Sequence, residues 1–179
     1  MKKLDNDNIL VLALKLCLIC FLMAMILAFL NSITAPRIEA SKEQATLAEL
    51  GNVISGAEFT KITDDVYKAE ISGKTVGYAV KATTTKGYGG NIDMLVGLSE
   101  DFSVLGLSII DDSETPGIGS RAMEKAFTDK FTGKKNTEIV KGSPSKENEV
   151  QAVSGATISS RAMNDGIFLA TEILKEALK

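Results

Sequence analysis

The sequence predicts an α+β protein, in which one transmembrane helix precedes a domain built on an antiparallel sheet and closed by a C-terminal helix. Residues 16–35 form an uncharged, mostly apolar run of 20 residues. Between residues 66 and 110, segments of alternating apolar residues are joined by short turns. Residues 157–178 then repeat apolar side chains at helical spacing. These three patterns predict the order anchor, sheet and helix.

Composition limits the classes of function that need consideration. The chain has 179 residues, of which 45% are hydrophobic, and its formal net charge is -3. It therefore has room for one membrane segment and one domain, and an acidic balance argues against a nucleic-acid partner. It contains no histidine, which removes the commonest metal ligand and the usual base of a hydrolase triad. We expect no metal site and no independent catalysis from this chain.

The apolar run predicts an uncleaved membrane anchor. At about 1.5 Å per residue, it spans roughly the 30 Å of a hydrocarbon core. Lys2, Lys3 and Lys15 precede it and favour a cytoplasmic N-terminus with an exported domain. A cleavable signal peptide is the competing interpretation, but its apolar region is typically about 7–15 residues long, and Pro36 would follow the cut.

The two cysteines, Cys17 and Cys20, both fall inside the apolar run. A four-cysteine cluster would need two ligands from another chain, so we interpret them as lipid-facing or helix-packing residues. The remainder of the chain has no cysteine, and its stability must come from packing without a disulfide.

The segment after the anchor predicts a helix over residues 38–50 that ends at Gly51. This helix would link the membrane anchor to the folded domain. We expect a tail and anchor over residues 1–35, a linker helix and connection over 36–60, and a folded domain over 61–179.

Four segments of the domain have strand character. They cover residues 66–71, 75–84, 92–98 and 103–110, with a turn at Ser72-Gly73, a glycine-rich loop at residues 87–90 and a turn at residues 99–101. Joins this short connect antiparallel strands, because parallel neighbours need a longer crossover. The sequence therefore predicts an antiparallel sheet.

The second half of the domain is less regular. A loop over residues 111–119 precedes a predicted helix over 120–131, and the polar stretch that follows has a short strand at 139–140. We expect a last strand over 149–153, followed at once by the long helix over 157–178.

The join between that last strand and the helix carries the most informative string, Ser154-Gly155-Ala156-Thr157. A helix start presents unpaired backbone N–H groups and the positive end of the helix dipole, so it suits a phosphate beside Thr157. The alternative is that these hydroxyl residues merely cap the helix. Residue types alone leave both interpretations open.

Two further strings accompany it, namely Gly87-Tyr88-Gly89-Gly90 and Glu114-Thr115-Pro116-Gly117-Ile118-Gly119. With these strings, the chain resembles the FMN-binding domain family found in the G subunit of Rnf complexes and in the C subunit of sodium-translocating NADH:quinone oxidoreductase. The resemblance implies that Thr157 carries FMN through a phosphoester bond. The family often has an acidic residue three positions before the motif serine, where this chain has Gln151.

The resemblance also implies the residues of the flavin site. We expect Ser154, Gly155 and Ala156 on the phosphate side. A wall beside the ring is expected from Glu114, Thr115, Gly117, Ile118 and Gly119. Tyr88 has two interpretations, as an aromatic that stacks on the flavin or as a core tyrosine at a strand edge.

The implied function is that of an electron-transfer subunit in a membrane complex that couples ferredoxin and NAD chemistry to sodium or proton movement. Covalent FMN would be attached by an FAD:protein FMN transferase, and the other subunits of the Rnf-type complex would be its partners. We expect a single pass through the cytoplasmic membrane, with the flavin domain on the extracytoplasmic side. The alternatives are a stand-alone membrane-anchored flavoprotein and a non-redox scaffolding module that binds a small anion.

Overall fold

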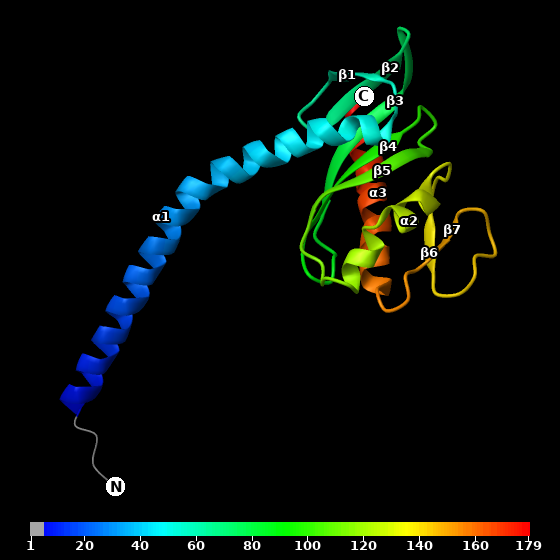
Figure 1. Ribbon diagram of the computed structural model, residues 1–179. Coiled ribbons are helices and arrows are strands. Elements are labelled where there is room, and N and C mark those ends of the chain that lie inside the picture. Colours follow the sequence, from blue (N-terminus) through cyan, green and yellow to red (C-terminus); the bar gives the residue numbers. More distant parts are fainter. Residues whose placement is uncertain (1–5) are drawn as a thin grey trace. The chain divides into compact units, whose positions relative to one another are not determined.

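The computed structural model describes residues 6–179, which divide into two compact units. The first unit extends to Glu43, and the second runs from Gln44 to Lys179. Figure 1 labels the helices and strands. The predicted α+β class is confirmed, because one long apolar helix precedes a five-stranded antiparallel sheet and a C-terminal helix. Lys2 and Lys3, used above to predict the membrane orientation, lie outside the described residues.

Helix α1 covers Asn6–Val53 without interruption. Its stretch Ile9–Val53 is long and apolar enough to cross a membrane, by length and composition. The predicted separate helix over residues 38–50 is wrong, because α1 continues through Pro36 and past Gly51. Proline removes one N–H of the helical ladder and glycine costs about 1 kcal/mol in a helix. Packing beyond Gly51 offsets that cost, since Leu50 and Val53 are buried in the domain.

The main sheet has the strand order β1-β2-β3-β4-β5, with every neighbouring pair antiparallel. Its strands are β1 (Glu58–Lys61), β2 (Val66–Ile71), β3 (Lys74–Thr84), β4 (Ile92–Leu98) and β5 (Val104–Asp112). Ser72 and Gly73 both have positive φ, as the two-residue turn of a hairpin requires. The four predicted strands are confirmed within two residues, whereas β1 was missed. Its four residues, with an almost fully exposed pattern, carry no apolar alternation.

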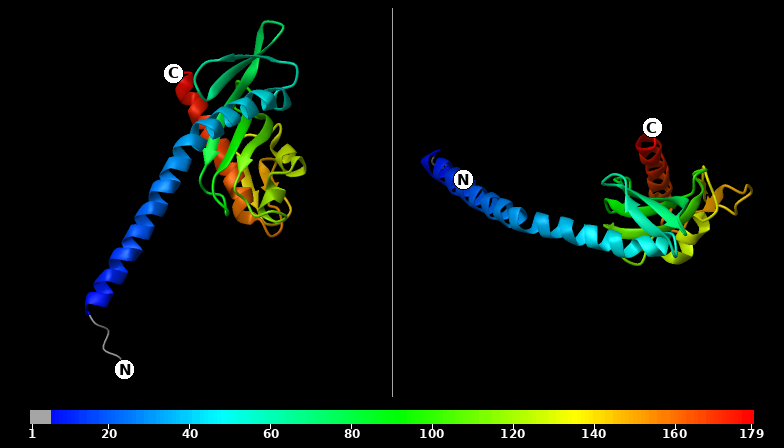
Figure 2. Two further views of the ribbon diagram at one scale, coloured as in Figure 1. Left: turned by 60° about the vertical axis from the view of Figure 1, so that its left-hand side comes forward. Right: turned by 90° about the horizontal axis from the view of Figure 1, so that it is seen from above.

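The sheet is covered on both faces. Helix α3 (Thr157–Ala177) packs on one face, where the larger cluster of buried side chains lies. The last turns of α1 pack on the other face through Leu50 and Val53 (Figure 2). Strand β4 is consequently buried along its whole length, which corrects the predicted alternation of one buried and one polar face.

Two glycines allow α1 to reach the second face. Gly97 of β4 and Gly106 of β5 are directly paired across the sheet. A methyl group added at Gly106 would overlap the backbone carbonyl of Val53, and one at Gly97 would lie 2.5 Å from the Val53 Cγ1 atom. The two glycines therefore leave a notch in this face of the sheet, where no side chain projects, and the end of α1 packs into it.

The predicted helix over residues 120–131 is wrong in its continuity. It is divided into η1 (Gly119–Ala122), α2 (Lys125–Thr128) and η2 (Asp129–Phe131). The break lets Phe127 and Phe131 both enter the core, with their ring centroids 5.4 Å apart in an edge-to-face contact. Core packing therefore prevails over helical regularity here.

The last two strands form their own sheet. Strand β6 (Glu138–Val140) pairs in parallel with β7 (Glu149–Gln151), separately from the main sheet. The predicted last strand over 149–153 is thus two residues too long. The N–H group of Val153 donates to the Ser160 hydroxyl at 3.0 Å instead of continuing a strand ladder. Chain direction changes at this bond, and α3 begins four residues later.

Candidate functional site

A pocket lies at the start of α3, where three loops meet. Its volume is about 670 Å³, within the range of small-ligand sites. The lining residues come from the glycine-rich loop after β3, the loop after β5 and the first turn of α3. They are Tyr88, Thr115, Ile118, Gly119, Gly155, Ala156, Thr157, Ile158 and Ser159.

The backbone at the start of α3 is free for an anion. Ala156 is the N-cap residue, and no side-chain hydrogen bond from the described residues 9–179 caps this helix. The interpretation of the Ser/Thr cluster as capping residues is therefore wrong. Unpaired N–H groups of a first helical turn, together with the helix dipole, favour a phosphate. Thr157 is the first helical residue, half-buried, and it lines the pocket.

Ser160 fixes the loop that leads to Thr157. Its hydroxyl accepts the N–H of Val153 at 3.0 Å and donates to the carbonyl of Ala156 at 2.9 Å. The Ala156 N–H also bonds the Val153 carbonyl at 2.9 Å, which closes a tight turn. Gly155 occupies that turn with φ of 83°, where an L-residue would be strained.

Strand β7, which precedes this loop, is braced by a buried carboxylate. Glu149 accepts the backbone N–H of Ser145 at 2.6 Å and that of Lys146 at 3.3 Å. The Ser145 bond is the main reason why the pKa of Glu149 lies below its ordinary value, because the charged form is the better acceptor. Gln151, at the end of the same strand, is exposed.

The loop after β5 forms the opposite wall. Thr115-Pro116-Gly117-Ile118 is a hydrogen-bonded turn, with the Ile118 N–H bonding the Thr115 carbonyl at 3.3 Å and Gly117 at φ of 78°. Proline second and glycine third are the residues that such a turn requires. The turn places Thr115, Ile118 and Gly119 in the lining, whereas Gly117 lies outside it.

Large apolar side chains surround the mouth of the pocket. Tyr88 is 71% exposed, Ile118 54% and Ile158 52%. The interpretation of Tyr88 as a core residue is thus wrong. Ile158, one of the apolar residues at helical spacing in residues 157–178, also lines the pocket. Exposed apolar groups gathered at a concave site are typical of a binding surface for a planar organic ring.

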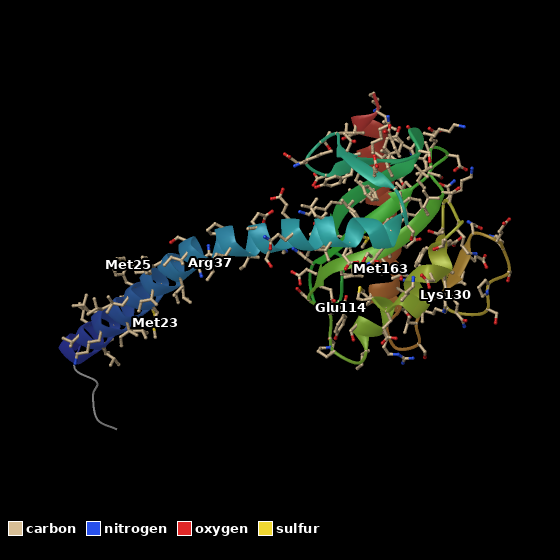
Figure 3. The ribbon with its side chains drawn as sticks, turned by 45° about the horizontal axis from the view of Figure 1, so that its top comes forward. Met23, Met25, Arg37, Glu114, Lys130 and Met163 are labelled. Carbon is tan, nitrogen blue, oxygen red and sulfur yellow. The ribbon has the colours of Figure 1, made fainter. Side chains whose placement is uncertain are left out.

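Two other predicted site residues, Ser154 and Glu114, lie outside the lining of the pocket. Ser154 is exposed and lies outside the lining. Glu114 is buried behind the wall, 6% exposed, with its Oε1 atom accepting the N–H of Tyr88 at 2.8 Å. Figure 3 labels Glu114 in the loop between β5 and η1, and Met163 on α3. Of the nine predicted site residues, six meet in the lining.

Comparisons with known proteins agree with this geometry. The FMN-binding domain family matches residues 87–172, a range that contains every lining residue. The G subunit of the Na⁺-translocating ferredoxin:NAD⁺ oxidoreductase complex of Acetobacterium woodii is 31% identical, over 99% of this chain and 97% of that protein. Its counterpart in the proton-translocating complex of Clostridium ljungdahlii is 34% identical, over 96% of this chain and 94% of that protein.

The chain belongs to the family of Rnf complex G subunits. The crystal structure of Shewanella oneidensis NqrC has a related fold, with a TM-score of 0.50 and 23% identity over 64% of this chain and 62% of that one. Within this G-subunit chain, residues from all three sequence strings line one pocket. The strings did not indicate the roles of Ser160 or Ile158. In a sequence, a hydroxyl or apolar residue near a helix start gives the same pattern whether its side chain faces the core or the pocket.

Proposed function

We propose that this chain is the flavin-carrying, electron-transferring subunit of a membrane complex that couples electron flow between ferredoxin and NAD to sodium or proton movement. FMN is attached to Thr157 in this proposal. The observation that carries it is the position of Thr157, which is both the first residue of an uncapped helix and part of the lining of a mainly apolar pocket.

The residues of the pocket fit the two ends of FMN. The first turn of α3 offers N–H groups and dipole to the phosphate. At Gly155, two residues before Thr157, an added methyl group would meet no atom within 4 Å, so this side of the loop is open. The apolar faces of Tyr88, Ile118 and Ile158 would border the ring and exclude water from it.

When bound, FMN supplies the exchange of one or two electrons. The chain's own residues have a simpler task, since they orient the cofactor and shape its surroundings. This agrees with a soluble domain that contains no histidine and no cysteine.

Attachment requires a separate enzyme in this proposal. An FAD:protein FMN transferase would form the phosphoester bond to the Thr157 oxygen and break the pyrophosphate bond of FAD, with AMP as the leaving group. The proton of the threonine hydroxyl would go to a base of the transferase. A tethered flavin cannot be lost by dilution, which matters for a domain outside the cytoplasm.

The partners are the other subunits of an Rnf-type complex. The relatives are named as subunits of ion-translocating oxidoreductase complexes. Residues 16–35 of this chain contain no charged residue, so the described part of the membrane helix offers no path for an ion. Ion movement in this proposal belongs to the partner subunits.

Intact mass of the full-length protein tests attachment. After co-expression with a transferase, the wild type should gain the mass of one FMN less one water, and Thr157→Ala should gain none. The variant should still fold, because the Thr157 side chain caps nothing. Thr157→Ser keeps the oxygen and should retain partial attachment. A flavin adduct on Thr157→Ala would place the attachment elsewhere, and a wild type without flavin would contradict the proposed function.

A further inference from the structure

We infer that Glu114 is a positioning residue of the flavin site, which holds Tyr88 over the mouth of the pocket. The inference rests on the proposed function only in naming flavin as the molecule that Tyr88 covers. The interaction itself is a feature of the chain alone.

A single hydrogen bond joins the buried carboxyl to the exposed loop. Oε1 of Glu114 accepts the backbone N–H of Tyr88 at 2.8 Å, across 26 residues of sequence. Glu114 is 6% exposed, while Tyr88 is 71% exposed and lines the pocket. This hydrogen bond therefore fixes the loop backbone at Tyr88, whose side chain lies at the mouth of the pocket.

The backbone that bears this carboxyl is also held by hydrogen bonds. The N–H of Glu114 donates to the Oδ1 atom of Asp112 at 2.9 Å, at the end of β5. The N–H of Ser113 donates to the carbonyl of Asn91 at 3.1 Å, where β4 begins. The Glu114 backbone is therefore held by the end of the main sheet. Through its hydrogen bond to the Tyr88 N–H, the Glu114 side chain fixes the position of the Tyr88 backbone as well.

The glycines of both strings make room for this side chain. A methyl group at Gly119 would overlap the Oε2 atom of Glu114, and one at Gly87 would lie 2.8 Å from Oε1. A methyl group at Gly89 would overlap the carbonyl of Ser113. These glycines are needed for the close approach of the two loops around Glu114.

Only one of the two carboxyl oxygens of Glu114 makes a hydrogen bond within the described residues. Oε2 of Glu114 is the one buried side-chain oxygen or nitrogen without a hydrogen-bond partner among residues 9–179, whose side chains the structure describes. An unpaired buried oxygen opposes folding. What the side chain supplies is a fixed acceptor for the Tyr88 N–H, and so a fixed place for the tyrosine ring.

Hydrogen exchange of the cofactor-free protein tests the interaction without any flavin. In the Thr157→Ala background, Glu114→Asp shortens the side chain by one methylene and should raise exchange at the Tyr88 amide roughly tenfold, as expected for loss of one hydrogen bond. Glu114→Gln keeps an acceptor oxygen and should leave exchange near the parent value. Glu100→Ala, an exposed residue in the turn after β4, is the matched control. Unchanged exchange in Glu114→Asp would overturn the inference.

Flavin fluorescence of the full-length flavinylated protein tests the consequence. Removal of the ring in Tyr88→Ala should increase both the fluorescence and its quenching by iodide. Glu114→Asp should do the same, and the double variant should exceed neither single variant, because both changes act through one ring. Additive effects, or a flavin unaffected by Glu114→Asp, would show that Glu114 does not act through Tyr88. A wild type without flavin would contradict the proposed function, while the exchange experiment would still decide the role of Glu114.

Discussion

At the scale of single residues, the site depends on two side chains that do not face the pocket. Ser160 and Glu114 each hold a loop that bears a pocket residue, the first through Val153 and Ala156 and the second through Tyr88. Residues that line a pocket can act only where their backbone is placed, so these supporting hydrogen bonds help to set the geometry of the pocket.

Ser160→Ala should weaken the fold and the attachment together. It removes both bonds of the hydroxyl and leaves the Val153 N–H without its acceptor, so we expect the free energy of unfolding to fall by about 1–2 kcal/mol. Urea unfolding measures this change, and the flavinylated fraction under limiting transferase should fall with it. Ser154→Ala is the matched control for stability, because Ser154 is exposed. Equal stability of the two variants would argue against the bracing role of Ser160.

Gln151→Asp restores the acidic residue that the family often carries at this position. Gln151 is exposed at the end of β7, so the change leaves the core untouched. The flavinylated fraction, measured by intact mass under limiting transferase, should rise or stay the same. A clear fall would show that the family's acidic position corresponds to another residue of this chain.

At the scale of elements, the end of α1 packs closely on the sheet at two positions that have no side chain. Gly97 and Gly106 form a cross-strand pair, and the last turn of α1 lies against it. Larger residues at either glycine would separate Val53 from the sheet. The helix end is therefore part of the domain core, even though the same helix contains the candidate membrane span.

Gly106→Ala should disturb this contact. The added methyl group overlaps the Val53 carbonyl, which is backbone and cannot rotate away, so we expect a loss of about 1–3 kcal/mol in the free energy of unfolding. Thermal or urea unfolding measures it. Gly142→Ala is the matched control, since an added methyl group there meets no atom within 4 Å. If both variants are equally stable, the notch does not restrict the approach of α1.

At the scale of the whole molecule, the function depends on which side of the membrane holds the flavin domain. The proposed orientation rests on Lys2, Lys3 and Lys15 before the apolar run. An extracytoplasmic domain also gives covalent attachment a physical purpose, because a dissociated cofactor could not be regained there.

Ser41→Cys reports this orientation. Ser41 is exposed on α1, after the apolar run, and Cys17 and Cys20 are replaced by alanine so that one thiol remains. We expect a membrane-impermeant thiol reagent to label the variant in whole cells, as measured by a mass shift of the purified protein. Labelling that occurs only after lysis would place the domain in the cytoplasm.

The sequence by itself determined the order of anchor, antiparallel sheet and closing helix. Those features depend on local periodicity and on short joins, which are present in any stretch of chain before it folds. The strings at residues 87–90, 114–119 and 154–157 carried the family resemblance, and residues from all three meet in one pocket. Their glycines and proline impose turns locally.

The tertiary structure decided the features that depend on contacts between distant residues. Helix α1 continues past Gly51 because Leu50 and Val53 pack on the sheet. The predicted helix over 120–131 is divided because Phe127 and Phe131 both pack in the core. Glu114 was expected beside the flavin and lies behind the wall, bonded to a residue 26 positions away. No local pattern encodes such a partner, since its free energy comes from the fold that brings the two loops together.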